Sequence, residues 1–259
     1  MPIVSPDGKR VMYITFPGPQ RTELWVSDID GGQRVKIVTG ENLGTGSWAP
    51  DNFHLSFVEI GASAGEMAYI VGADGSGLHQ LPPMGGPPFT LVWSSDQKSV
   101  YVTIWEKVGQ SFEIWKWSVD GSSPEKLVDN CGFVTDADPA GGYVLGALLS
   151  GERTGIYEVS ISDRRCIPLF PGVVTYGARF ARDRKSFLYA VPSSGEVTIY
   201  RQPWKEGKLM GAPQAALKVP LAFQAFYLGG NAYDFSRDLS TIVYGRPSGH
   251  AELYLLSQK

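Results

Sequence analysis

The stretch Trp48-Ala49-Pro50-Asp51 is one copy of a four-residue motif that returns along this 259-residue chain. A copy has an aromatic residue, two mostly small residues and an aspartate, and an alternating apolar run follows it. The other clear copies are Trp93-Ser94-Ser95-Asp96, Phe180-Ala181-Arg182-Asp183 and Phe235-Ser236-Arg237-Asp238, while Val4-Ser5-Pro6-Asp7 opens the chain without the aromatic. The motif recurs about every 44 residues, and a fixed period in this range indicates a repeat architecture.

One gap between copies is nearly two periods long, which predicts a degenerate copy inside it. The segment Asp136-Ala137-Asp138-Pro139 occupies this place, with Tyr143 where the next apolar run begins. The chain therefore contains six repeats.

Each repeat reads as short strands separated by turns. In the first repeat the runs are Val11–Phe16, Glu23–Ser27 and Val35–Val38, which are rich in β-branched and aromatic residues and bounded by Gly, Pro or Asp. The strand that ends at the motif makes four strands per repeat. Four antiparallel strands repeated radially are typical of a propeller blade. We therefore predict an all-β fold, a six-bladed β-propeller of four-stranded antiparallel blades, with no helix.

The predicted propeller is a single domain over residues 1–259. The approximate blades are 1–41, 42–86, 87–129, 130–172, 173–220 and 221–259. The fifth repeat is longer than the others, and we expect its extra residues, Gln202–Lys208 and the stretch after them, to form an extended outer hairpin. The last repeat stops after its third strand, so we expect the last blade to be incomplete.

Composition limits the classes of function. The chain is 43% hydrophobic, which is ample for a core, and its net charge is −3 with no basic run, so a nucleic-acid partner is not indicated. No apolar run is long enough for a membrane segment within this chain. The compartment is not decided, although an extracytoplasmic location would follow if a membrane helix precedes the propeller. Cys131 and Cys166 are far apart in sequence, and we expect both to be free, structural thiols.

Several segments resemble known propellers. Ser5–Arg10, Glu23–Val26 and Asp28–Gly32 resemble the WD-repeat-like motif of TolB-type propellers. Ile199–Lys208 and Asn231–Asp238 resemble the C-terminal propellers of bacterial serine/threonine protein kinases and related winged-helix regulators. The resemblance implies a sensor or partner-binding domain of a larger signalling protein, whose kinase domain would lie elsewhere because no kinase motif is present here.

Three patterns that can carry chemistry have simpler explanations. Gly61–Gly65 matches Gly-x-Ser-x-Gly, but it lies where a strand-to-strand hairpin is expected, whereas a nucleophile needs a strand-to-helix turn. Asp28–Gly31 is better explained as a turn than as a calcium loop. None of the three histidines is two or four residues from another, so they form no metal motif. We therefore expect no catalytic residue, no metal and no cofactor, and a protein that is not an enzyme.

Asp136 is the most unusual residue, because it stands where the other copies of the motif have an aromatic. An isolated carboxylate between blades would be costly, so Asp136 is either hydrogen-bonded or faces the axial channel, or a local bulge displaces it. Loops that lead into the innermost strands form one mouth of this channel. The predicted ligand-binding residues at this mouth are Phe89, Asp136, Asp138, Tyr176, Arg179, Asn231, Tyr233 and Asp234.

The sequence thus favours a non-catalytic sensor or interaction propeller that binds a protein, a peptide or a small molecule at the channel mouth. One alternative is a propeller hydrolase or lyase with its site at the same mouth. Another is a structural scaffold that docks a partner by its outer edge.

Overall fold

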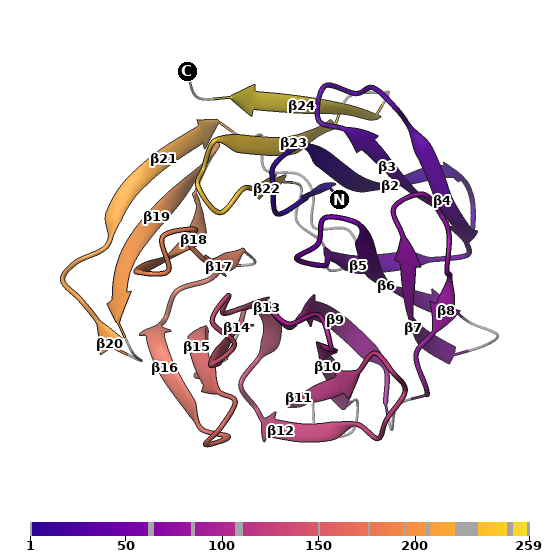
Figure 1. The fold of residues 1–259 in the computed structure, drawn as a ribbon. Helices are drawn as coiled ribbons and strands as arrows, with labels where there is room; N and C mark the ends of the chain where they lie inside the picture. The colour runs from indigo at the N-terminus through magenta and orange to yellow at the C-terminus, as the bar shows by residue number, and fades with distance from the viewer. Residues whose placement is uncertain are drawn as a thin grey trace.

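The computed structural model describes residues 2–61, 65–83, 86–106, 111–149, 151–175, 177–193, 195–205, 208–220, 233–247 and 251–257. Within these residues every regular element is a β-strand. The strands form separate antiparallel sheets arranged around a central axis (Figure 1). This confirms the prediction of an all-β propeller built from small antiparallel sheets. The same residues contain no helix long and apolar enough to cross a membrane.

Each sheet is built from strands that are consecutive in the chain. The first four sheets contain β1 (Pro2–Val4), β2 (Arg10–Gly18), β3 (Arg21–Asp28) and β4 (Val35–Gly40); β5 (Leu43–Trp48), β6 (His54–Gly61), β7 (Gly65–Gly72) and β8 (His79–Gln80); β9 (Pro88–Trp93), β10 (Ser99–Glu106), β11 (Ser111–Ser118) and β12 (Glu125–Asp129); and β13 (Phe133–Ala137), β14 (Tyr143–Leu148), β15 (Gly155–Ser160) and β16 (Cys166–Pro171). The fifth contains β17 (Ala178–Phe180), β18 (Ser186–Ser193), β19 (Glu196–Lys205), β20 (Lys208–Leu209) and β21 (Gln214–Pro220), and the last contains β22 (Tyr233–Phe235), β23 (Thr241–Pro247) and β24 (Ala251–Ser257). In each sheet the first strand lies nearest the axis and the chain then moves outward to the rim (Figure 1).

The blade count differs from the prediction of six four-stranded blades. Five sheets have four or more strands and are complete blades, whereas the sheet of β22, β23 and β24 has three strands among the described residues. The structure therefore shows five complete blades, not six. The expected extension of the fifth repeat is present, because β19 pairs with both β20 and β21. Likewise β6 and β7 pair up to Gly61 and Gly65, as expected for a hairpin, while Ser63 lies outside the described residues.

The repeated motif forms the turn that follows each innermost strand. In the β1–β2 turn the Ser5 N–H donates to the Arg10 carbonyl at 2.9 Å, and the Asp7 carboxylate accepts the Lys9 N–H at 3.1 Å. The residue after the aspartate has a positive φ angle, which glycine and asparagine tolerate most easily; it is Gly8, Asn52, Gln97, Arg184 or Leu239 in the clear copies. The motif therefore recurs because each blade needs the same tight turn at the same place.

The aromatic residue of the motif packs between neighbouring sheets. Trp48 is buried in a cluster with Met12 and Leu24 of the first sheet and Leu55 and Phe57 of the second. Trp93, Phe180 and Phe235 are buried in equivalent clusters. Burying a side chain of this size stabilises the fold by roughly 2–3 kcal/mol, so the aromatic positions account for much of the cohesion between blades.

The two cysteines form a disulfide, which corrects the expectation of free thiols. Cys131 precedes β13, Cys166 begins β16, and their Cα atoms are 6.1 Å apart. Both cysteines belong to the apolar cluster between the third and fourth sheets, which also includes Val128 and Val159. The radial stacking of the sheets brings them together although 35 residues separate them in sequence.

Side-chain and main-chain contacts near the axis close the ring. No described strand of the first sheet pairs with a strand of the last sheet. Instead β1 lies against β22, where the Val4 N–H donates to an Asp234 carboxylate oxygen at 2.8 Å. Val4, Val11 and Val243 form a small buried cluster at the same junction.

Candidate functional site

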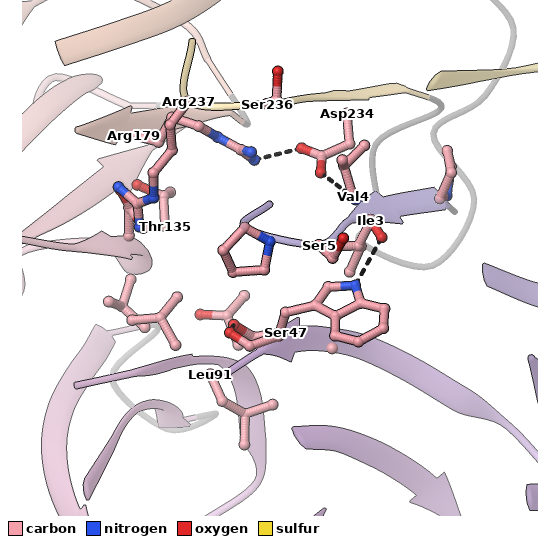
Figure 2. Close-up of a pocket in the computed structure, with 18 of the residues that line it drawn as sticks. Ile3, Val4, Ser5, Ser47, Leu91, Thr135, Arg179, Asp234, Ser236 and Arg237 are labelled. Atoms are coloured by element: carbon pink, nitrogen blue, oxygen red, sulfur yellow. Dashed lines mark hydrogen bonds and ion pairs between the residues drawn. The ribbon is translucent and has the colours of Figure 1, made fainter. Parts of the chain in front are cut away.

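A cavity of about 160 Å³ lies on the propeller axis between the innermost strands. One residue from each innermost strand, the one directly before the aromatic position of the motif, lines it. These residues are Ile3, Ser47, Val92, Asp136, Arg179 and Asp234. Figure 2 shows that Ser47, Arg179 and Asp234 surround the same space although they come from different sheets. The cavity wall therefore combines apolar, hydroxyl and charged groups.

Asp136 stands at this cavity position, not at the aromatic position that the sequence predicted. In the fourth sheet the Asp138 N–H donates to the Tyr143 carbonyl, as the Ser94 N–H donates to the Ser99 carbonyl in the third. Asp138 is therefore equivalent to Ser94, and Ala137 takes the place of the aromatic. An irregularity in the β13–β14 pairing between Val134 and Asp136 accompanies this offset.

Asp138 belongs to the turn and not to the cavity wall. Its carboxylate accepts the Ala140 N–H at 2.9 Å and the Gly142 N–H at 3.3 Å. It thereby replaces the motif aspartate, whose position in this copy is occupied by Ala140. This corrects the assignment of Asp138 to the channel mouth.

Asp136 links three sheets through one carboxylate. It accepts both terminal nitrogens of Arg237 at 2.7 Å and the Phe180 N–H at 2.7 Å. Arg237 also donates to the Phe180 carbonyl at 2.9 Å. The paired geometry is the two-pronged guanidinium–carboxylate contact that gives a strong, oriented ion pair. The fourth, fifth and last sheets are thus tied together beside the cavity.

Asp234 forms a second charged link on the other side. It accepts the Val4 N–H and is hydrogen-bonded to Arg179, whose guanidinium lies over the Phe235 ring at 4.6 Å from its centroid. Burial raises the pKa of Asp234, although Arg179 and the Val4 N–H oppose this effect. The buried Nε–H of Arg179 has no hydrogen-bond partner among the described residues.

The remaining predicted site residues have different positions. Tyr233 lines the cavity and is half-buried. Phe89 does not line it and packs on Phe112 and Phe133, with ring centroids 5.5 and 5.6 Å away. Tyr176 and Asn231 lie outside the described residues. The structure therefore brings together Asp136, Arg179, Tyr233 and Asp234, and their role in binding stays a prediction.

Sequence reasoning missed Arg237, which is the partner of Asp136. The available signal was the third position of the motif, which is proline in Trp48-Ala49-Pro50-Asp51 but arginine in the last copy. The hydroxyl residues of the wall, Ser47 and Thr135, were also missed, because they belong to strands without an unusual pattern. No group of three metal-binding side chains occurs within the described ranges.

Comparisons with known proteins give one distant sequence relative and a shared fold. No family model matches the chain. This chain is 25% identical over 118 residues to the "Uncharacterized peptidase YuxL" of Bacillus subtilis (strain 168). The match covers 43% of this chain and 18% of the relative. The chain thus spans less than a fifth of the length of the curated relative it matches.

Solved structures show the same fold. TolB from Acinetobacter baumannii aligns with a TM-score of 0.64 and 18% identity over 80% of this chain and 55% of that one. The β-propeller domain of the Trilobed protease from Pyrococcus furiosus, described as having an open velcro topology, aligns with a TM-score of 0.58 and 16% identity over 98% of this chain and 78% of that one. The TolB-like propeller fold is therefore shown, whereas the resemblance to kinase-linked sensors is not.

These findings correct the expectation that the protein is not an enzyme. The curated relative is named a peptidase, and a protease propeller aligns with almost the whole chain.

Proposed function

We propose that this chain is the propeller of a peptidase-type hydrolase and that its axial cavity holds a segment of the peptide substrate. The cavity is the observation that carries the proposal. Its wall offers apolar surface from Ile3 and Val92, hydroxyl groups from Ser47 and Thr135, and the side chain of Arg179. A peptide presents the matching groups, which are apolar side chains and carbonyl oxygens. The peptidase relative supports the same class of substrate.

The size of the cavity limits what enters it. Pockets for drug-sized ligands measure roughly 300–1,000 Å³, whereas this cavity measures about 160 Å³. One side chain or one short peptide end fits such a volume, and a folded domain does not.

In this proposal the three-stranded sheet of β22, β23 and β24 serves as the sixth blade, because it supplies Asp234 and Arg237 to the wall of the cavity.

Calorimetric titration of short acetylated peptides into the purified chain tests the proposal, with a cavity-filling substitution as the critical variant. Ser47→Phe places a ring in the cavity and is expected to weaken peptide binding at least tenfold. Ser122→Phe is the matched control, because Ser122 is exposed at the β11–β12 turn on the rim. Mass spectrometry of the same mixtures records cleavage of the peptides. Absence of saturable binding, or equal binding by wild type and Ser47→Phe, would refute the proposed site.

A further inference from the structure

A second hollow adjoins the axial cavity on the face that carries the motif turns. Two connected depressions of about 410 and 300 Å³ share Arg182, Arg237 and Asp238. Lys9 lines the first depression and Arg201 lines the second. We call this hollow the arginine groove, defined by Lys9, Arg182, Arg201 and Arg237. It adjoins the axial cavity, because Pro6 and Arg237 line both.

Two of the groove's carboxylates, Asp183 and Asp238, accept several hydrogen bonds from the fold, while the third, Asp7, accepts the Ser5 hydroxyl and the Lys9 N–H through one oxygen. Asp183 accepts the Lys185 N–H at 2.8 Å, the Ser186 N–H at 3.1 Å and Arg201 at 2.8 Å. Burial works against ionisation of Asp183, but these hydrogen bonds and the Arg201 charge outweigh it, so the pKa of Asp183 lies below its ordinary value. Its lone pairs are directed to groups of the fold and not to the groove.

Asp238 is occupied in the same way. It accepts the Ser240 N–H at 3.0 Å, the hydroxyls of Ser236 and Ser240 at 2.7 Å, and Arg182 at 3.0 Å. Burial again opposes ionisation, and the hydrogen bonds from Ser240, Ser236 and Arg182 more than compensate, so the pKa of Asp238 is lowered. The groove therefore offers few free acceptors.

The guanidinium groups, in contrast, keep unoccupied donors. A guanidinium has five N–H donors. Arg182 uses one terminal nitrogen on Asp238, and its side chain is 79% exposed. Arg201 uses one terminal nitrogen on Asp183 and the Ser186 hydroxyl, and its side chain is 33% exposed. Each groove arginine is paired with a carboxylate, but Arg182 and Arg201 keep free N–H donors, and such donors favour a ligand group that is rich in acceptors, such as a carboxylate.

We propose that the arginine groove binds the carboxylate of a peptide whose preceding residues lie in the axial cavity. This inference rests on the proposed function and names the charge that its substrates carry. Each depression has a volume in the range of ligand pockets, and Arg237 lines both depressions and the axial cavity, so the two binding regions adjoin. The carboxylate comes either from a free C-terminus or from an acidic side chain at that end.

Three peptides that differ only at their last residue separate these sources. The first is acetyl-Ala-Phe-Ala-Ala with a free carboxylate, the second is its C-terminal amide, and the third is the amide with glutamate in the last position. We expect the wild-type chain to bind the first peptide roughly five- to tenfold more tightly than the second, and to lose most of this preference in 1 M salt. Tight binding of the third peptide as well would support the groove and show that a side-chain carboxylate suffices.

The arginine variants locate the effect. The double substitution Arg182→Gln with Arg201→Gln is expected to make the Kd values of the acid and the amide equal. The control double substitution, Arg164→Gln with Arg165→Gln, removes two exposed arginines of the fourth sheet outside the groove and should preserve the difference. Thermal unfolding of both variants verifies that they fold.

The outcomes distinguish this inference from the proposed function. Equal binding of acid and amide to the wild type, still blocked by Ser47→Phe, would overturn the groove and retain the cavity. A preference for the acid that persists in the groove variant would also overturn the groove. Failure of all three peptides to bind would overturn both proposals.

Discussion

Two aspartates hold the centre of the ring at the scale of single residues. Asp136 and Asp234 each accept a backbone N–H from the next sheet and an arginine from a different sheet. A buried carboxylate is stable only when its oxygens are satisfied in this way. The two ion pairs therefore fix the positions of the innermost strands, and with them the shape of the cavity.

The Asp136–Arg237 pair gives a direct stability test. Asp136→Asn and Arg237→Gln are each expected to lower the free energy of unfolding by about 2–4 kcal/mol, because each leaves a largely buried partner without its counter-charge. A double-mutant cycle in urea should show a coupling energy of at least about 1 kcal/mol. The exposed pair Asp163–Arg165 serves as control and should couple by less than about 1 kcal/mol. Equal coupling in the two cycles would show that the central pair has no special role.

Repetition of one turn dominates the scale of the secondary-structure elements. In the third sheet the Asp96 carboxylate accepts the Ser94 hydroxyl at 2.6 Å and the Lys98 N–H at 3.1 Å. The hydrogen bonds from Ser94 and Lys98 lower the pKa of Asp96. The ionised turn aspartates thus stabilise the innermost hairpins, since each turn fixes the register of the strands it joins.

The lowered pKa of Asp96 predicts how the stability depends on pH. The native state binds the proton of the Asp96 carboxyl less tightly than the unfolded state does. The stabilisation that ionised Asp96 gives to the fold is therefore complete above the ordinary pKa of 3.8 and is lost as the pH falls through the lowered pKa. Asp96→Asn should therefore cost about 0.5–1 kcal/mol at pH 7, and the difference from wild type should shrink below pH 3.8. Urea unfolding between pH 7 and pH 2 measures this. A difference that does not change with pH would contradict the assignment.

The disulfide joins the connection between β12 and β13 to β16, the strand at the far edge of the fourth sheet. Because Cys131 and Cys166 are 35 residues apart, loop closure alone predicts that the bond stabilises the fold by roughly 3–4 kcal/mol. The double substitution Cys131→Ala with Cys166→Ala should lower the Tm by several degrees, and a reducing agent should lower the Tm of the wild type but not of the variant. Titration of the unfolded protein should find no free thiol before reduction. Two free thiols would contradict the pairing.

The sequence predicted the elements well and the tertiary details less well. The motif of Trp48–Asp51 located the turns, because turn chemistry is local and needs particular residues at fixed offsets. The position of Asp136 was wrong by one residue, because the irregular pairing near Val134 has no signature in the sequence. The Cys131–Cys166 bond and the Arg237 partner depend on how the sheets stack, and no local pattern encodes that.

At the scale of the whole molecule, the ring is closed at its innermost strands. β1 and β22 meet beside the axis, and Asp234 joins them through the Val4 N–H. The same residue lines the axial cavity, so ring closure and the candidate binding site share one group. Substitutions that loosen the junction are therefore expected to affect binding as well.

Asp234→Asn tests this junction. The amide cannot form the charged pair with Arg179, so we expect a loss of about 2–4 kcal/mol in the free energy of unfolding. Hydrogen exchange should quicken at the Val4 amide and around β22, while the amides of β10 and β14 in the middle of their sheets stay protected. Unchanged exchange at Val4 would show that other contacts close the ring.

The central claim is that a peptide occupies the axial cavity of this propeller. Photo-crosslinking tests it most directly, with a short acetylated peptide that carries benzoylphenylalanine and with mass spectrometry to locate the adducts. Adducts are expected on the innermost strands β1, β5, β9, β13, β17 and β22, and they should be lost in Ser47→Phe. Adducts confined to the outer strands at the rim, or unaffected by Ser47→Phe, would contradict it.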